Sequence, residues 1–312
     1  MTTTAPSAKA ETKAPAKASV SDRLRGERRL GFYLTLPSYI LMLLVTAYPL
    51  GYAVVLSLYN YRLTDPAGRS FVGLDNYGVI LTDPLWWTDF TTTLLITVVT
   101  VAIELVVGFG FAFVMLRIVR GRGPLRTAIL IPYGIVTVVS AFVFRYAFAL
   151  DSGFVNHWLN LQDFNWFGDR WSALFVICLS EIWKTTPFIS LLLLAGLVQV
   201  PEDMQEAAKV DGATAWQRLW KVTLPNMKAA IMVALLFRTF DAWRIFDNPY
   251  VMTGGANKTE TLSFLAYRQN VSLVNLGMGS AVSVLLFFTV VIIAFIFVKI
   301  FRTDLSQARG DQ

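Results

Sequence analysis

The feature that most constrains this chain is a run of 32 consecutive residues without a formal charge, from Leu30 to Tyr61. About 20 predominantly apolar residues are enough for a helix to cross a bilayer. Charged residues make up 15% of the chain and hydrophobic residues 55%, whereas about 25% charged residues is usual for a soluble domain. We therefore predict an all-α integral membrane protein. A soluble enzyme and a nucleic-acid-binding protein are both disfavoured, despite a pI of about 9.4.

Apolar stretches recur along the chain, and we predict one transmembrane helix for each. The six predicted spans are Phe32–Leu58, Phe90–Leu116, Thr127–Phe144, Ser172–Val200, Ala229–Ala242 and Leu273–Val298. Pro37 and Pro49 are expected to end or bend a helix in the first stretch. The predicted organisation is a disordered tail at 1–29, a transmembrane domain at 30–302 and a second tail at 303–312.

The distribution of Lys and Arg predicts the orientation of these spans. With the N-terminus inside, 18 of the 27 basic residues lie on the cytoplasmic side and seven on the other side. Cytoplasmic loops carry the excess of positive charge in membrane proteins, so we predict a multi-pass membrane protein with both termini in the cytoplasm. A single cysteine, Cys178, excludes an internal disulfide, and with His157 alone no Cys/His metal cluster can form.

One cytoplasmic connection, residues 201–225, differs in composition from its apolar surroundings. Pro201 suits a first helical position, and residues up to Val210 have good helix propensity. Asp211-Gly212 is then expected to break the helix, because glycine readily adopts a positive φ. A second amphipathic helix should run from Ala213 to about Val222. The pattern predicts a helix–turn–helix beneath the membrane, which would serve either as a docking element or as an interfacial connector.

The spacing within this connection resembles a known motif. Glu206-Ala-Ala208 is followed by Gly212 and then by Val222-x-Leu224-Pro225, which resembles the EAA loop of the permeases of ATP-binding-cassette importers. Every spacing matches, and the only departure is Val222 where isoleucine is usual. Segments 71–77, 253–255 and 277–283 resemble the carbohydrate branch of this family. Segments 131–139, 181–188 and 237–248 are similar to permeases of trehalose importers.

The resemblance implies that the protein lies in the bacterial inner membrane and works together with several other polypeptides. A loop of this type couples the permease to a cytoplasmic ATPase, and the implied coupling residues are Glu206, Ala207, Ala208, Asp211, Gly212 and Ala213. The implied partners are a second permease subunit, a dimeric P-loop ATPase that uses ATP and Mg, and an extracytoplasmic sugar-binding protein or lipoprotein. This chain is expected to bind no cofactor or metal and to have no catalytic activity. It has no phosphate-binding loop of its own, since Gly254–Thr259 lacks the second glycine of that motif.

Charged residues inside predicted spans are the candidates for the transport path. A charge at the centre of a membrane helix costs roughly 2.5–3.5 kcal/mol, so such residues should face protein or a water-filled cavity. Glu181 and Lys184 can pair along one helix, whereas a charge ladder of alternating sign begins at Arg238 and Asp241. The candidate substrate-path residues are Lys184, Thr185, Arg238, Asp241, Trp243 and Asn248. A purely structural network of charges is the competing interpretation.

Four further residues in the second span have predicted roles. Glu104 is the single charge in that span and is expected to be structural, or else to face a polar cavity or a partner permease. Gly108, Gly110 and Ala112 are expected to permit close helix packing.

Two other functional classes are alternatives to a permease: a secondary transporter and an intramembrane enzyme. An ion-coupled secondary transporter for a polar solute could use Glu181 and Lys184, but six spans without a visible repeat weaken this alternative. An intramembrane enzyme lacks support, because the sequence has no HExxH helix and no nucleophile with an adjacent base.

Overall fold

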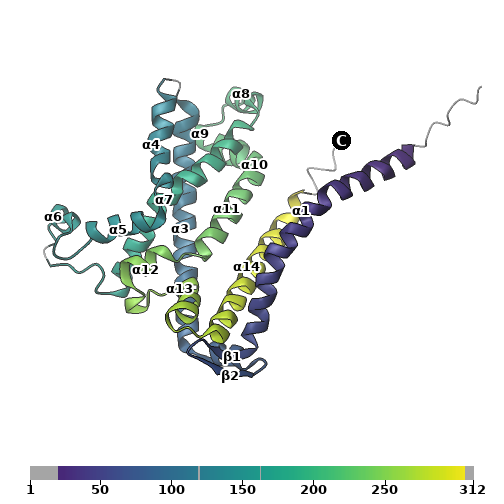
Figure 1. Ribbon diagram of the computed structural model, residues 1–312. Helices are drawn as coiled ribbons and strands as arrows, with labels where there is room; N and C mark the ends of the chain where they lie inside the picture. Colours follow the sequence, from purple (N-terminus) through teal and green to yellow (C-terminus); the bar gives the residue numbers. More distant parts are fainter. Residues whose placement is uncertain (1–19, 119, 162, 306–312) are drawn as a thin grey trace, which may run out of the picture. The chain divides into compact units, whose positions relative to one another are not determined.

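The computed structural model describes residues 20–118, 120–161 and 163–305, and these residues are almost entirely helical (Figure 1). The elements in chain order are α1 (Val20–Ser57), β1 (Tyr59–Arg62), β2 (Asp65–Phe71), α2 (Asp75–Thr82), α3 (Pro84–Arg117), α4 (Arg122–Gly134), α5 (Thr137–Ala147), α6 (Phe154–Leu159), α7 (Arg170–Val198), α8 (Glu202–Val210), α9 (Ala215–Arg218), η1 (Leu219–Thr223), α10 (Leu224–Asn226), α11 (Lys228–Trp243), α12 (Asp247–Thr253), η2 (Ala256–Lys258), α13 (Leu262–Tyr267), η3 (Arg268–Ser272) and α14 (Leu276–Leu305).

The N-terminal unit covers residues 1–52 and consists, in its described part, of most of α1. The helix continues through Pro37 and Pro49 rather than ending at either. It begins at Val20, inside the segment predicted to be a disordered tail, and the first 19 residues of that prediction lie outside the described residues. Its apolar side chains are exposed, as expected of a helix whose environment is lipid.

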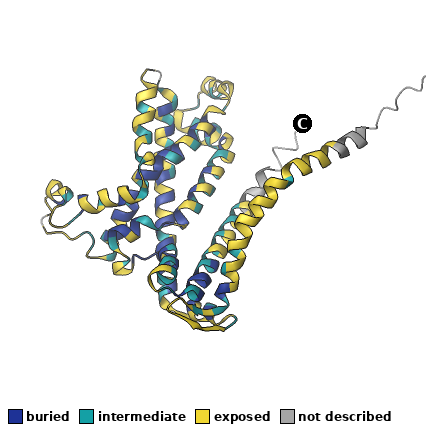
Figure 2. Cartoon of the chain, in the orientation of Figure 1, coloured by how far each residue is buried: buried dark blue, intermediate teal, exposed yellow. Residues whose placement is uncertain are grey.

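The larger unit begins at Ala53 and is built around α3 and α7, which pack along much of their length. Helices α4 and α11 lie against the same pair, and buried residues are concentrated along α3, α7 and the end of α11 (Figure 2). One apolar core joins Met115 of α3, Leu193 of α7 and Ala234 of α11. A second core joins Trp243 to Leu262 of α13 and Val282 of α14.

Four helical stretches are long and apolar enough to span a membrane: Glu27–Ser57, Pro84–Arg117, Arg170–Val198 and Leu276–Lys299. They correspond to the first, second, fourth and sixth predicted spans. The fifth predicted span is the helix α11, which has only 16 residues. At about 1.5 Å per residue it is shorter than the hydrocarbon core of a bilayer.

The third predicted span is not one straight helix. It is divided into α4 and α5, which meet at an angle of 89°. Pro132 lies in the last turn of α4, and Ile135 and Val136 then adopt extended backbone conformations. Proline removes a backbone donor, and the β-branched residues that follow have lower helix propensity. With this bent pair counted as one span, the described residues contain five candidate spans.

A short antiparallel hairpin, which the sequence analysis did not predict, follows α1. β1 pairs with β2 in a register that places Tyr59 opposite Phe71, with an irregularity between Asn60 and Arg62. Tyr59 and Phe71 also make an edge-to-face ring contact at 5.4 Å. The hairpin is joined to the start of α14 through a bridge between Arg62 and Asn275.

The contact between α3 and α7 depends on a small residue at one position. A Cβ added to Gly108 would meet the Ile189 Cγ2 atom at 2.9 Å and the Ser190 backbone nitrogen at 3.3 Å. Gly110, predicted to have the same role, has nothing within 4 Å of such an atom and is exposed. The prediction for Gly110 is therefore wrong for packing within this chain, because successive glycines two residues apart face different sides of a helix.

We expect Gly108→Val to lower the thermal unfolding midpoint in detergent, because overpacking a tight contact typically costs about 1–3 kcal/mol. Gly110→Val is the matched control, since it makes the same change of helix propensity in the same helix without a steric clash. Equal midpoints for the two variants would show that the α3–α7 contact does not depend on the missing side chain of Gly108.

Candidate functional site

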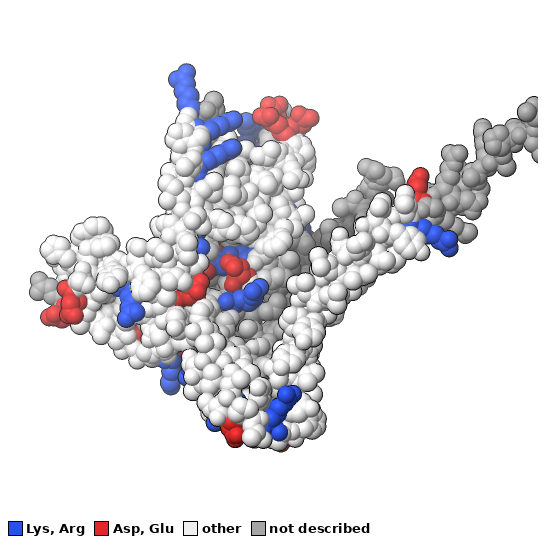
Figure 3. Space-filling view, in the orientation of Figure 1, with Lys and Arg blue, Asp and Glu red and all other residues white. Residues whose placement is uncertain are grey.

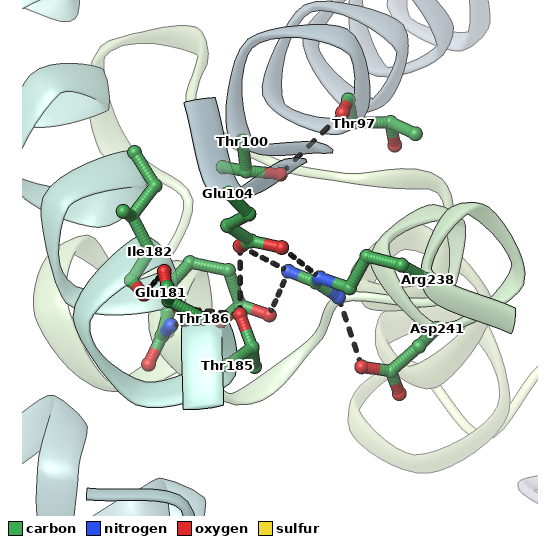
Figure 4. Close-up of polar contacts among 10 residues, drawn as sticks. Thr97, Thr100, Glu104, Glu181, Ile182, Thr185, Thr186, Arg238 and Asp241 are labelled. Carbon is green, nitrogen blue, oxygen red and sulfur yellow. Dashed lines mark hydrogen bonds and ion pairs between the residues drawn. The ribbon is translucent and has the colours of Figure 1, made fainter. Parts of the chain in front are cut away.

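Three charged side chains from three helices meet inside the membrane-spanning part of the larger unit (Figure 4). The guanidinium of Arg238 on α11 donates through Nε and Nη2 to the two carboxylate oxygens of Glu104 on α3, with Nη2–Oε1 at 2.9 Å. Nη2 also donates to Glu181 Oε1 on α7 at 2.9 Å. Glu104 and Arg238 have no exposed side-chain surface. This two-point geometry is the strongest form of an arginine–carboxylate pair.

Neutral polar side chains complete the network. The Thr185 hydroxyl donates to Glu104 Oε1 at 2.7 Å, and the Asn248 amide donates to Glu181 Oε2 at 2.6 Å. Arg238 Nη1 donates to Asp241 Oδ2 at 2.9 Å, and this carboxylate is 69% exposed. Glu181 therefore pairs with Arg238 rather than with Lys184, which the sequence analysis proposed as its helical partner. Glu104 is a full member of the network, in agreement with its predicted structural role.

A cavity of about 500 Å³ lies beside this network, and acidic and basic side chains gather near the middle of the body in Figure 3. The cavity is lined by Tyr133, Thr137, Glu181, Lys184, Thr185, Asp241, Arg244, Ile245, Phe246 and Asp247. Three carboxylates and two cations therefore line the cavity, together with two aromatic residues. Lys184 Nζ lies 5.6 Å from the ring centre of Tyr133, and this ring stacks on Phe188 at 5.4 Å.

Such a lining can bind a polyhydroxylated, uncharged solute. Carboxylates accept hydrogen bonds from hydroxyl groups, whereas Lys and Arg donate to hydroxyl oxygens. The nearly balanced charge gives no strong preference for an ionic solute. The cavity has no arrangement suited to a metal either, because no group of three or more His, Cys, Asp or Glu side chains that could hold an ion occurs within the described residues.

The predicted substrate-path residues fall into three groups. Lys184, Thr185 and Asp241 line the cavity. Arg238 and Asn248 lie behind its wall, where both bind Glu181.

Trp243, the remaining candidate, does not line the cavity. Its indole nitrogen donates to the Thr289 hydroxyl at 2.9 Å, and its ring packs edge-on against Phe90 at 5.6 Å. It is 3% exposed and belongs to an apolar core. The structure thus corrects this one candidate, because the helical position of Trp243 points toward α3 and α14 instead of the polar side.

The predicted charge ladder from Arg238 to Asp247 is interrupted. α11 ends at Trp243 and α12 begins at Asp247, so the intervening residues leave the helix. Arg238 and Asp241 form the expected ion pair, whereas Arg244 and Asp247 turn into the cavity wall. The sequence analysis noted these two charges only as part of the ladder, and the helix break after Trp243 is what brings them beside Lys184.

The second candidate site is the helix–turn–helix at 201–225. α8 ends in a Schellman motif: the Gly212 amide donates to the Lys209 carbonyl at 3.0 Å and the Ala213 amide to the Ala208 carbonyl at 2.9 Å. Gly212 has a φ of +78°, in the left-handed region that favours glycine. The turn therefore forms at the predicted position, and its geometry explains why this position carries a glycine.

The helical segment after the turn begins with a capping box. The Thr214 hydroxyl accepts from the Gln217 amide at 3.3 Å, and the Gln217 side chain accepts from the Thr214 amide at 2.8 Å. The segment continues as the π-helical turn η1 and ends at Asn226, beyond the Leu224-Pro225 boundary that the sequence predicted. It can pass Pro225 because this proline occupies a first-turn position of α10.

The surface of α8 and of the turn is exposed. Glu206, Ala207, Asp211 and Gly212 are all exposed, whereas Ala208 and Ala213 are half-buried. Val210, the last residue of α8, is 88% exposed. The small and exposed side chains leave the backbone of this turn accessible.

Comparison with known proteins identifies the family. Residues 104–307 match the model of the binding-protein-dependent transport system inner membrane component. The chain belongs to this family. It is thus a non-catalytic, multi-pass inner-membrane permease of an ATP-binding-cassette importer. This membership favours the permease over the ion-coupled transporter and the intramembrane enzyme, and it confirms the predicted family.

Several curated relatives cover most of the permease. It is 53% identical over 275 residues to the trehalose transport system permease protein SugA of Mycobacterium tuberculosis, covering 88% of this chain and 89% of that protein. It is 37% identical to the trehalose/maltose transport system permease protein MalF of Thermococcus litoralis, covering 89% and 96%. It is also 37% identical to the sulfoquinovosyl glycerol transport system permease protein SmoG of Agrobacterium fabrum, covering 89% and 92%.

A solved structure shares the fold. The permease superposes on a chain of a bacterial alginate ABC transporter, crystallised in complex with an alginate pentasaccharide-bound periplasmic protein, with a TM-score of 0.75. The identity is 19%, and the match covers 89% of this chain and 96% of that chain. At this identity the similarity shows the fold alone.

Proposed function

We propose that this permease forms half of the translocation path for a disaccharide, and that the disaccharide is trehalose. The observation that supports trehalose as the substrate is the 53% identity to a trehalose permease over 88% of the chain. The relative from Thermococcus litoralis, whose name includes both trehalose and maltose, supports the same class of solute.

The chemistry of the cavity supports an uncharged sugar. Asp241 and Asp247 can accept hydrogen bonds from sugar hydroxyls, Lys184 and Arg244 can donate to them, and the Tyr133 ring can pack on the apolar face of a pyranose. A volume of about 500 Å³ is within the usual range of ligand pockets. We infer that the sugar passes along this wall and that Arg238 and Asn248 act indirectly, by fixing Glu181.

The complete transporter is proposed to contain four further polypeptides. A second permease supplies the other half of the path, two ATPase subunits use ATP and Mg, and an extracytoplasmic binding protein delivers the sugar. The excess of Lys and Arg on one side of the predicted spans supports cytoplasmic termini. The same orientation puts the 201–225 segment on the cytoplasmic side, where an ATPase can reach it.

The coupling site is proposed to be the turn formed by Glu206, Ala207, Ala208, Asp211, Gly212 and Ala213, of which Ala208 and Ala213 are half-buried and the others exposed. Small side chains there let a partner surface approach the backbone closely. Closure of the ATPase dimer would move this turn, and with it the two helices that flank it in the sequence, α7 and α11. Both helices reach the cavity, through Glu181 and Lys184 of α7 and Asp241 of α11.

Uptake of labelled trehalose by cells that contain the complete transporter tests the substrate and the cavity together. We expect saturable, ATP-dependent uptake by the wild-type transporter and a roughly tenfold lower maximal rate for Arg244→Gln, equivalent to about 1.4 kcal/mol for lost charged hydrogen bonds. Trp243→Phe is the control, because Trp243 does not line the cavity, and it should stay within about twofold of wild type. Absence of trehalose uptake by the wild-type transporter would contradict the substrate. An undiminished maximal uptake rate for Arg244→Gln would contradict the proposal that the sugar passes through this cavity.

The turn at Gly212 tests the coupling site. Gly212→Val forces a β-branched side chain into the left-handed region, at a cost of about 1–2 kcal/mol. We expect it to reduce trehalose uptake and to weaken the stimulation of ATP hydrolysis by the loaded binding protein. Gly212→Asn is the control, because asparagine tolerates this conformation. With equal amounts of assembled complex, similar coupling in the two variants would exclude a role for the geometry of this turn.

A further inference from the structure

A second hollow, away from the sugar cavity, lies between the end of α3 and the segment that follows the coupling turn. Its volume is about 560 Å³. It is lined by Phe113, Val114, Arg117, Ile118, Gln205, Ala215, Trp216, Arg218, Leu219 and Thr223. Gln205 of α8 donates to the Thr223 hydroxyl at 2.9 Å, and this bond ties α8 to η1 at the edge of the hollow. The proposed coupling surface and this hollow therefore share one structural element.

The lining combines apolar side chains with two guanidinium groups and contains no carboxylate. Arg117 lies over the ring of Phe113, with its guanidinium carbon 5.8 Å from the ring centre. Arg218 is half-buried, and its Nε atom is buried without a hydrogen-bond partner among the described residues. A buried donor without an acceptor costs about 1–3 kcal/mol. An anionic ligand in the hollow would remove this cost.

The side of the hollow formed by the end of α3 and the connection to α4 is strongly basic, whereas α8 on the other side carries Glu202, Asp203 and Glu206. The stretch from Arg117 to Arg126 carries four arginines and no acidic residue. In Figure 3 Lys and Arg side chains gather at the end of the body where α3 and α4 meet. Arg122 is engaged locally, since its Nε donates to the Ile118 carbonyl at 2.6 Å. Arg117 and Arg218 are thus the two cations of this region that line the hollow itself.

Exposed tryptophans lie on the same element. Trp216, which lines the hollow, is 67% exposed, and Trp220 one turn later is 56% exposed. The two rings make an edge-to-face contact, with their centroids 5.6 Å apart. Tryptophan is enriched where protein meets the lipid headgroups. The aromatic pair therefore indicates that this part of the chain lies at the membrane surface.

We propose that this hollow binds an anionic phospholipid, with its phosphate between Arg117 and Arg218 and its glycerol and first acyl carbons against Phe113, Val114 and Ile118. Basic pockets at the cytoplasmic ends of membrane helices are suited to anionic headgroups. A free phosphate ion would leave the apolar part of the wall unused, which favours a lipid. This inference rests on the proposed orientation of the permease, because the cytoplasmic leaflet is the one rich in anionic lipid.

Lipid binding to the complete transporter in detergent tests this proposal. Native mass spectrometry would follow added phosphatidylglycerol and phosphatidylcholine with identical acyl chains. The wild-type complex is expected to retain phosphatidylglycerol preferentially, and Arg117→Gln combined with Arg218→Gln is expected to weaken this retention at least tenfold. The matched control combines Arg120→Gln with Arg126→Gln, which removes the same charge nearby from two exposed side chains and should change retention less than about twofold.

Three results would overturn the lipid site. The first is equal retention of the two lipids by the wild-type complex. The second is an equal loss in the lining and control variants, which would mean diffuse attraction by the whole basic surface. The third is displacement of bound lipid by glycerol phosphate alone at equal concentration, which would mean a site for the free anion.

A protein occupant is distinguished by a separate measurement. Gln205→Cys places a thiol on the wall of the hollow, and we expect added phosphatidylglycerol to slow its reaction with a maleimide in the assembled complex. Protection by the ATPase without any effect of lipid would overturn the proposal in favour of a protein contact. Trehalose uptake is measured separately, in cells that contain the same variants, so loss of the substrate assignment and loss of the lipid site give different results.

Discussion

The rest of this permease depends on the ion pairs that the buried guanidinium of Arg238 makes with Glu104 and Glu181. A cation in the centre of an apolar helix is tolerated only with close partners, since isolated charges at this depth cost several kcal/mol. Its partners come from α3 and α7, so one side chain joins the three helices that form the middle of the body. The same contacts fix Glu181, one of whose oxygens also accepts from Asn248. The polar wall of the cavity is therefore held in place by Glu104 and Arg238, which are themselves fully buried.

Two helices connect this wall to the proposed coupling turn. α7 carries Glu181 and Lys184 and ends at Val198, four residues before α8 begins. α11 starts at Lys228, directly after the coupling segment, and carries Arg238 and Asp241. A displacement of the turn therefore reaches the cavity through two helices that Arg238 joins to each other. This arrangement gives a physical route for coupling, in which packed helices move as units between discrete positions.

Features with a local cause could be predicted from the sequence. The apolar stretches are helical, as predicted. The turn at Gly212 could be predicted because the residue after α8 needs a positive φ, which glycine readily adopts. Features that depend on which face of a helix meets a neighbour could not. Glu104 and Arg238 are 134 positions apart, and nothing local pairs them. The ring of Trp243 packs against Phe90 instead of lining the cavity. Of the two glycines, only Gly108 contacts α7. Packing between helices decides both orientations.

The break between α4 and α5 shows a limit of the same kind. Hydropathy alone predicts one span from Thr127 to Phe144, since both halves are apolar. Pro132 is compatible with a helix break in this stretch. A proline can also lie inside a continuous helix, however, as Pro37 and Pro49 do in α1. Whether a proline ends a helix depends on what the freed backbone groups can bind, and this is a property of the tertiary structure.

The most direct test of the Arg238 network is a double-mutant cycle with Glu104→Gln and Arg238→Gln, measured as thermal unfolding midpoints in detergent. Removing one partner of a buried ion pair typically costs about 3–5 kcal/mol, because the other charge is left unpaired. We therefore predict large decreases for both single variants and a much smaller decrease for the double variant than their sum. Asp241→Asn should change little, since this carboxylate is 69% exposed. Strictly additive decreases for Glu104 and Arg238 would contradict the account.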